Sequence, residues 1–213
     1  VSVEGQGTVS PATGTFTAGT TQSVTAIPAA GYLFVGWSGD AGGTQNPLQL
    51  VMNTHKHIVA RFAPKPVKEL TYPVTMAPRN DYTPVIVGLQ ADTIERFFGL
   101  TAAQVASRLG TTIRYYAINL NGTLDSNSTA ANPGHWFDSS GRVVAYGVSA
   151  RVFSELNLQE MSVRIGQYPG RCRAGESYTI RQALIYYKSP TEVYQLNLVF
   201  PILISDTPVA KMP

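Results

Sequence analysis

Short runs of alternating apolar and polar residues, separated by turn residues, extend over most of the chain. Ile58, Ala60 and Phe62 alternate with their neighbours, and similar runs occur at 70–76, 151–156 and 178–187. A period of two is typical of half-buried β-strands, and the Gly and Pro residues between the runs mark turns. The pattern therefore predicts a mainly β protein.

Helical spacing is confined to residues 92–98 and 101–109. In the second segment Thr101 is a predicted N-cap, Gln104 completes a capping box, and Gly110 follows the last helical turn. These segments are too short to form a core of their own. We therefore expect a β-sandwich-like core that carries a short two-helix appendage.

A proline-rich stretch divides the chain. Residues 63–69 contain both prolines and charged residues, a composition typical of a semi-rigid linker. The predicted organisation is a small β-rich repeat module at 1–63, a linker at 64–69 and a β-sandwich-like accessory domain at 70–213.

The composition favours an extracytoplasmic bacterial protein. Only 14% of the residues are charged, the formal net charge is +3, and Cys172 is the single cysteine. One cysteine excludes an intramolecular disulfide and a thiolate metal cluster within the chain. No apolar run reaches the length of a membrane span, and no nucleic-acid-binding motif is present. We interpret the chain as a piece of a longer secreted or cell-surface protein.

Six arginines lie close together in the second half of the sequence, and two interpretations of them stay open: contact with an acidic polysaccharide, or a solvated protein face. They are Arg142, Arg151, Arg164, Arg171, Arg173 and Arg181.

Residues 132–147 carry the most informative local pattern. Asp138 to Gly141 has turn-forming residues between strand-forming ones, which predicts a β-hairpin. Trp136 has two interpretations. It is either a core residue, or it forms an aromatic platform for a sugar together with His135, Tyr146 and Tyr168.

The first 62 residues contain a recognisable series of motifs. Gly7-Thr8-Val9 precedes the run Gly-Tyr-Leu-Phe-Val-Gly-Trp-Ser-Gly-Asp at 31–40, and Ile58 to Phe62 follows. This series resembles the divergent internalin-B-type repeat of bacterial surface and secreted proteins. The resemblance implies a compact β-rich spacer, often attached to adhesins or polysaccharide-degrading enzymes. We expect Tyr32, Phe34 and Trp37 to form its core.

A second pair of motifs lies further along the chain. Gly-His-Trp-Phe-Asp at 134–138 and Ile-Gly-Gln-Tyr-Pro-Gly at 165–170 resemble an uncharacterised bacterial domain family, a domain of unknown function, over about residues 68–205. That family recurs as a terminal module of secreted and lipid-anchored proteins, several of them glycan-processing. The resemblance implies a location and neighbouring domains, but no reaction.

Residue types suited to catalysis are few. Asp138 and Glu155 are the only acidic pair worth testing for glycoside hydrolysis, but Asp138 suits a turn and Glu155 a strand face. Cys172 lies between two arginines, which predicts a lowered thiol pKa, yet no base accompanies it. We therefore expect no catalytic residue and no cofactor.

Metal ligands are also too few. Asp40 and Asn46 supply only two oxygen side chains, and the oxygen-rich run at 125–129 ends without the acid that would close a calcium loop. His55 and His57 have no further zinc ligands nearby. We expect no metal site.

What remains is binding through aromatic and hydrogen-bonding side chains. The predicted ligand-binding residues are Trp136, Tyr168, His135, Asp138, Gln167 and Arg171. The expected function is a non-catalytic glycan-binding or substrate-targeting accessory module, covalently linked to catalytic or surface domains of a larger protein. A structural or adhesive spacer without a small-molecule site is the alternative, and a glycan-active enzyme comes third.

Overall fold

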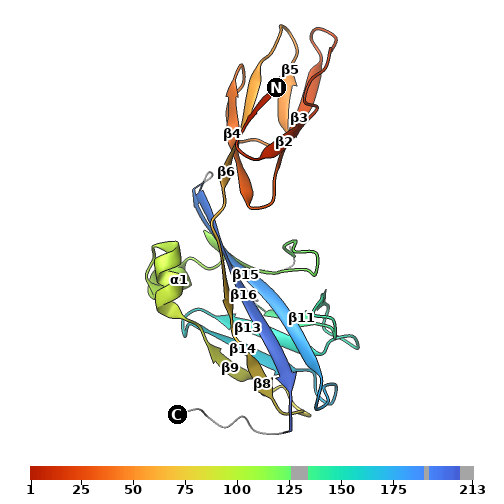
Figure 1. Ribbon diagram of the computed structural model, residues 1–213, viewed down its shortest axis with the longest axis vertical. Helices are drawn as coiled ribbons and strands as arrows, with labels where there is room; N and C mark the ends of the chain where they lie inside the picture. Colours follow the sequence, from red (N-terminus) through yellow and green to blue (C-terminus); the bar gives the residue numbers. More distant parts are fainter. Residues whose placement is uncertain (126–133, 190–191, 207–213) are drawn as a thin grey trace. The chain divides into compact units, whose positions relative to one another are not determined.

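A computed structural model describes residues 1–125, 134–189 and 192–206. The protein is mainly β with two short helices, as the alternation predicted (Figure 1). The chain divides into two compact units. One unit is Val1–Val67 together with Tyr187–Tyr194, and the other is Lys68–Tyr186 together with Gln195–Pro213.

The first unit contains two three-stranded sheets. One sheet has the order β1 (Ser2–Glu4), β6 (Ile58–Pro64), β4 (Tyr32–Gly39), and β1 runs parallel to β6. The other has the order β2 (Gly7–Ser10), β3 (Thr21–Pro28), β5 (Leu48–Val51), with antiparallel pairing.

Aromatic side chains fill the core of this unit. Trp37 is buried, its ring centroid lies 5.0 Å from that of Phe34, and its indole N–H donates to the carbonyl of Gln45 at 2.9 Å. Tyr32 and Phe34 are partly buried and pack against the same cluster. The prediction that these three aromatics form the core is confirmed for Trp37, whereas Tyr32 and Phe34 pack against the edge of the core and stay partly exposed.

The second unit contains two five-stranded sheets. The first has the order β10 (Ile113–Ala117), β15 (Ser177–Ser189), β16 (Glu192–Ile204), β7 (Val67–Thr71), and β8 (Val74–Met76) pairs with β16. The second has the order β12 (Val143–Val144), β11 (Gly134–Phe137), β13 (Val152–Asn157), β14 (Ser162–Gln167), β9 (Val85–Gly88), and all its pairs are antiparallel.

The two sheets of the second unit form a β-sandwich. Both sheets contribute fully buried side chains, among them Phe137, Val152, Ile165, Ile180, Leu184 and Phe200. Tyr115 of β10 and His135 of β11 meet between the sheets, with their ring centroids 5.2 Å apart. In β13 buried residues alternate with less buried ones, which leaves the other face of that sheet directed outward.

Two helices cover one side of the sandwich (Figure 1). They are α1 (Ala91–Phe98) and α2 (Ala102–Ser107). The predicted capping box is present, because Thr101 accepts from the backbone N–H of Gln104 and the Gln104 side chain accepts from that of Thr101. Phe98 is buried with its ring 5.6 Å from that of Tyr186 on β15, so the appendage is packed onto the sheet.

Candidate functional site

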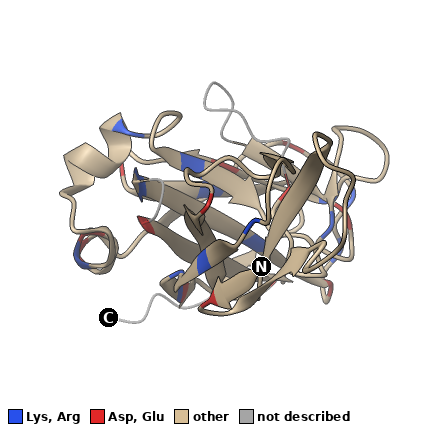
Figure 2. Cartoon of the chain, turned by 90° about the horizontal axis from the view of Figure 1, so that it is seen from above, with Lys and Arg blue, Asp and Glu red and all other residues tan. Residues whose placement is uncertain are grey.

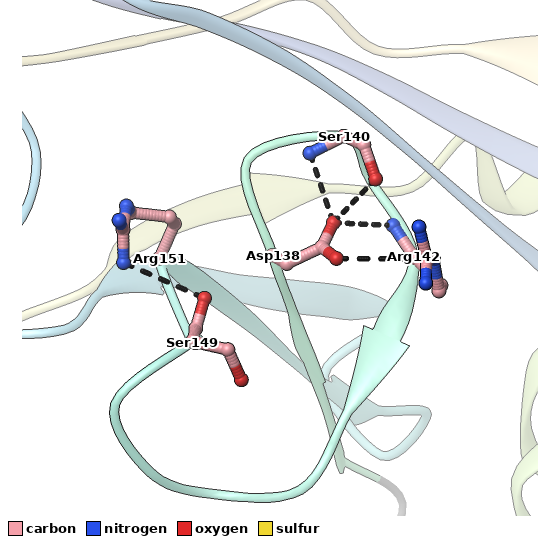
Figure 3. A network of polar contacts seen from close by, with 5 residues as sticks. All are labelled: Asp138, Ser140, Arg142, Ser149 and Arg151. Carbon is pink, nitrogen blue, oxygen red and sulfur yellow. Dashed lines mark hydrogen bonds and ion pairs between the residues drawn. The ribbon is translucent and has the colours of Figure 1, made fainter.

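The predicted hairpin is formed by β11 and β12. Asp138 opens the turn, and its Oδ1 accepts from the N–H and hydroxyl of Ser140 and from the N–H of Arg142 (Figure 3). Gly141 has φ +81°, and a Cβ there would lie 2.3 Å from the carbonyl oxygen of Thr179. The turn therefore requires both its aspartate and its glycine.

The hydrogen bonds of the turn also set the charge state of Asp138. Partial burial opposes ionisation, but the bonds from Ser140 and Arg142 outweigh it and lower the pKa of this carboxyl. The Arg142 side chain lies 3.9 Å away and adds to the effect. Asp138 is thus an ionised acceptor that the hairpin uses itself.

Five aromatic side chains gather on the outward face and at one end of the second sheet, and we call them the aromatic patch. They are Tyr82, Trp136, Tyr146, Phe153 and Tyr168. The Trp136 ring lies at the centre, with ring centroids at 5.0 Å for Phe153, 5.3 Å for Tyr146, 5.9 Å for Tyr168 and 6.2 Å for Tyr82. Most of these pairs are tilted or edge-to-face, the arrangement that aromatic quadrupoles favour.

Two tyrosines expose the patch to solvent. Tyr146 is 62% exposed and Tyr82 is 45% exposed, and their hydroxyl oxygens are 2.9 Å apart. Trp136 and Tyr168 are half-buried beneath them. Trp136 is thus neither a core residue nor a fully exposed platform. Its indole lies outside the sandwich core but is packed by other aromatic rings on several sides.

Gly166 leaves the space that the aromatic patch needs to pack against the sheet. Gly166 on β14 pairs with Phe153 on β13, and a Cβ at Gly166 would lie 2.3 Å from the Phe153 ring. Any larger residue would lift Phe153 and, with it, the contact to Trp136. This accounts for the glycine in the Ile-Gly-Gln motif.

Two arginines hold the loop that carries Tyr146. Arg151 Nη1 donates to the carbonyls of Val148, Ser149 and Ala150 at 3.4, 3.5 and 3.2 Å, and Figure 3 shows the bond to Ser149. Arg171 also donates to the carbonyl of Val148, and its guanidinium carbon lies 4.9 Å from the Tyr168 ring centroid. Arg171 therefore reaches the patch through cation–π stacking and fixes the loop beside it.

Two predicted ligand-binding residues point away from the patch. His135 and Gln167 are buried between the sheets. Gln167 donates to the carbonyl of Ala77 at 2.7 Å and accepts from the N–H of Arg79 at 3.0 Å, so it holds the segment before β9. Each is the direct neighbour of a patch residue, Trp136 or Tyr168, and neighbours on an extended chain point to opposite faces.

A small polar cluster surrounds His135. Gln182 Nε2 lies 3.3 Å from its Nδ1 and also donates to the Ser154 hydroxyl. Burial lowers the pKa of His135 to about 4, and the negative charge of Asp125 counteracts this only in part. The imidazole is therefore neutral at physiological pH.

The acidic pair considered for catalysis is engaged elsewhere. Glu155 lies on the outward face of β13 and pairs with Arg164 at 3.7 Å, while Asp138 serves the turn. Figure 2 shows acidic and basic residues interspersed along the chain. Arg181 likewise pairs with Glu69 at 3.5 Å, so several of the six arginines bind groups within the chain.

The prediction for Cys172 is wrong. Its thiol is buried, and this desolvation raises the thiol pKa, although the sequence neighbours predicted a lowered one. The flanking arginines are directed elsewhere: Arg171 stacks on Tyr168, and Arg173 is exposed. Cys172 Sγ instead donates to the carbonyl of Arg151 at 3.4 Å.

Across residues 1–125, 134–189 and 192–206, three or more His, Cys, Asp or Glu side chains do not come together as a metal site. Asp40 accepts from the N–H of His57 at 2.6 Å, and Asn46 bonds both the N–H and the carbonyl of Ala26. Residues 126–129 of the oxygen-rich run lie outside the described residues. The described helices include none long and apolar enough to span a bilayer.

Two patch residues were not predicted. Phe153 had a usable signal, because it shares its strand face with Glu155 while Val152 and Ser154 point inward. Tyr82 had none, because it lies in a loop 54 positions before Trp136, and only the folded chain brings them together.

Comparison with known proteins gives two family matches. Residues 1–66 match the model described as Divergent InlB B-repeat domain, a bacterial repeat family, and residues 81–191 match the model described as Domain of unknown function (DUF4859). Both predicted resemblances are confirmed as family memberships of these segments. Neither description names a reaction. The searches of curated proteins and of solved structures returned no match.

Proposed function

This chain belongs to the family of the Domain of unknown function (DUF4859), whose model covers just over half of it, and we propose that it is a glycan-binding accessory module of a larger extracytoplasmic bacterial protein. In this proposal the second unit binds the glycan through the aromatic patch. The module has no catalytic role and directs or retains covalently linked domains at a polysaccharide.

The observation that carries this proposal is the exposed aromatic patch. Sugar rings have C–H faces that pack on aromatic rings, while tyrosine hydroxyls and nearby polar groups bind their hydroxyls. Tyr146, Tyr82 and the neighbouring Val148, which is 78% exposed, leave apolar surface in water. Contiguous apolar surface of this kind marks interaction sites.

The arginine contacts favour a neutral glycan. Arg142, Arg164 and Arg181 each pair with a carboxylate, and Arg151 and Arg171 bind loop carbonyls. An acidic polysaccharide would have to compete with these internal partners. A neutral one needs only the aromatic surface and hydroxyl contacts.

For the first unit, a structural role fits better than glycan binding does. Its large aromatics Trp37 and Phe62 form a core against which Phe34 packs, and Trp37 is 4% exposed. Its family is a bacterial repeat that is often extracellular. We therefore propose that residues 1–66 are a spacer, and that the whole protein is secreted or held at the cell surface.

Affinity electrophoresis in gels that contain mixed-linkage β-glucan, xylan, galactomannan or polygalacturonate tests the proposal. We expect a neutral polysaccharide to retard the chain. Tyr146→Ala should weaken binding about 5- to 10-fold, because one exposed aromatic contact is removed. Leu203→Ala, at an exposed apolar residue of β16 outside the aromatic patch, is the matched control and should bind like the parent chain.

Absence of retardation in every gel would leave the spacer function for the whole chain. Hydrolysis of any of these polysaccharides would instead support an enzyme. An Asp138→Asn or Glu155→Gln variant that lost the hydrolysis while keeping its fold would then contradict the non-catalytic assignment.

A further inference from the structure

The outward face of the second sheet continues beyond the aromatic patch. Strands β11, β13, β14 and β9 lie side by side in this sheet (Figure 1). Cross-strand pairing places four of their residues in one row, namely Gly134, Glu155, Arg164 and Ile86. Residues two apart on a strand share a face, so this row borders the row that contains Trp136 and points outward with it. A charged row thus lies directly beside the aromatic patch.

A hollow of about 240 Å³ lies where the two rows meet. Its lining includes Trp136, Phe153 and Glu155, whose side chains point outward, and Gly134, which has no side chain. The remaining lining residues have their side chains buried between the sheets, so they contribute main-chain atoms. The hollow therefore belongs to the outward face, with aromatic rings on one side and a carboxylate on the other.

The charged groups beside the hollow have hydrogen-bonding capacity to spare. Glu155 Oε2 and Arg164 Nη1 are 3.7 Å apart, which is too long for a direct hydrogen bond. Their side chains are 48% and 49% exposed, and exposed ion pairs of this kind contribute little to stability. A ligand can therefore use the carboxylate as an acceptor and the guanidinium as a donor without breaking a strong internal contact.

A sugar ring matches this arrangement on both sides. Its C–H face packs on aromatic rings, which here are those of Trp136 and Phe153. Each of its hydroxyl groups both donates and accepts a hydrogen bond, so neighbouring hydroxyls can donate to a carboxylate and accept from a guanidinium. The small volume of the hollow suits one ring of a longer chain rather than a whole oligosaccharide.

We propose that the hollow over Gly134 holds one ring of a neutral polysaccharide, and that Glu155 and Arg164 are specificity-determining residues that bind hydroxyl groups of that ring. This inference rests on the glycan-binding function proposed above. The aromatic rings hold the C–H faces that many sugars share, whereas the charged pair selects sugars by the positions of their hydroxyls.

The charges of the pair argue against other ligand classes. An anionic ring in the hollow would meet the carboxylate of Glu155, and the described residues that line the hollow include no Lys or Arg. A cationic ring would compete with Arg164 for the same carboxylate. A purely apolar ligand would take water away from both charged groups without replacing its hydrogen bonds.

A second ion pair of the same unit supplies matched controls. Glu69 and Arg181 are 3.5 Å apart, with side chains 49% and 46% exposed, and they belong to the other sheet. Glu155→Ala is compared with Glu69→Ala, and Arg164→Ala with Arg181→Ala, so each comparison keeps the net charge equal. Titration calorimetry measures binding to the polysaccharides named above, and near-UV circular dichroism shows whether each variant folds.

We expect Glu155→Ala and Arg164→Ala each to weaken binding of the retarding polysaccharide about 5- to 10-fold, because a hydrogen bond to a charged group is lost. Glu69→Ala and Arg181→Ala should bind like the unmodified chain. In the unmodified chain, the Nε–H resonance of Arg164 should shift when that polysaccharide is added, while that of Arg181 stays in place. The resonance measurement needs no variant.

The outcomes separate this inference from the function on which it rests. If Tyr146→Ala loses binding while Glu155→Ala and Arg164→Ala bind like the unmodified chain, the glycan-binding function stands and the role of the charged pair is refuted. Equal losses in Glu155→Ala and Glu69→Ala would also refute that role, because they would reflect net charge alone. If no polysaccharide binds the unmodified chain, both proposals are refuted.

Discussion

Lowering the pH from 7 to 5 should destabilise the β-sandwich through His135. The unfolded side chain binds a proton near pH 6.5, whereas burial lowers the pKa in the folded protein to about 4. Between these values the unfolded state binds more protons, so the free energy of unfolding falls as the pH falls. For this single group the loss between pH 7 and pH 5 is about 2 kcal/mol.

Urea denaturation at pH 7, 6 and 5, followed by tryptophan fluorescence, measures this loss. His135→Gln removes the titrating group, so its free energy of unfolding should change less over the same range. The exposed His55 and His57 are present in both proteins and cancel in the comparison. Equal losses in the two proteins would refute the reasoning, because they would mean that folded His135 accepts a proton as readily as the unfolded one.

Three further predictions concern packing, capping and reactivity. Gly166→Ala should destabilise the protein by about 1–3 kcal/mol in thermal or urea unfolding, because its methyl group would overlap Phe153. Gly88→Ala, in the same sheet but with open space around it, should cost less. Thr101→Ala should cost about 1 kcal/mol through loss of the capping box, and an unchanged unfolding midpoint would contradict that role. Cys172 should react slowly with a thiol reagent at pH 7 and rapidly in denaturant, and equal rates would show that it is accessible.

Local patterns predicted the elements of this fold well. Thr101 and Gln104 predicted a capping box because both halves of that motif lie within one helical turn. Asp138 and Gly141 predicted the hairpin for the same reason. Motifs that span only a few residues form through local sterics and hydrogen bonds. Their formation therefore depends on residue types that can be read directly from the sequence.

The candidate site was harder to predict, because it depends on strand faces and on distant loops. Grouping His135 with Trp136 ignored the period of two, which sends these neighbours to opposite sides of β11. Tyr82 joins the patch only through the tertiary fold. The Cys172 prediction failed in the same way, since adjacency to arginines in sequence gave no information about its burial.

The arginine contacts to the 148–150 carbonyls have a kinetic consequence. Under the glycan-binding function proposed above, a loop that Arg151 and Arg171 already hold before a ligand arrives need not rearrange during the encounter. Association with different glycans should then proceed at similar rates, and the residence time of each complex should decide its affinity. The module would accordingly discriminate between sugars through their dissociation rates, with the preferred sugar dissociating most slowly.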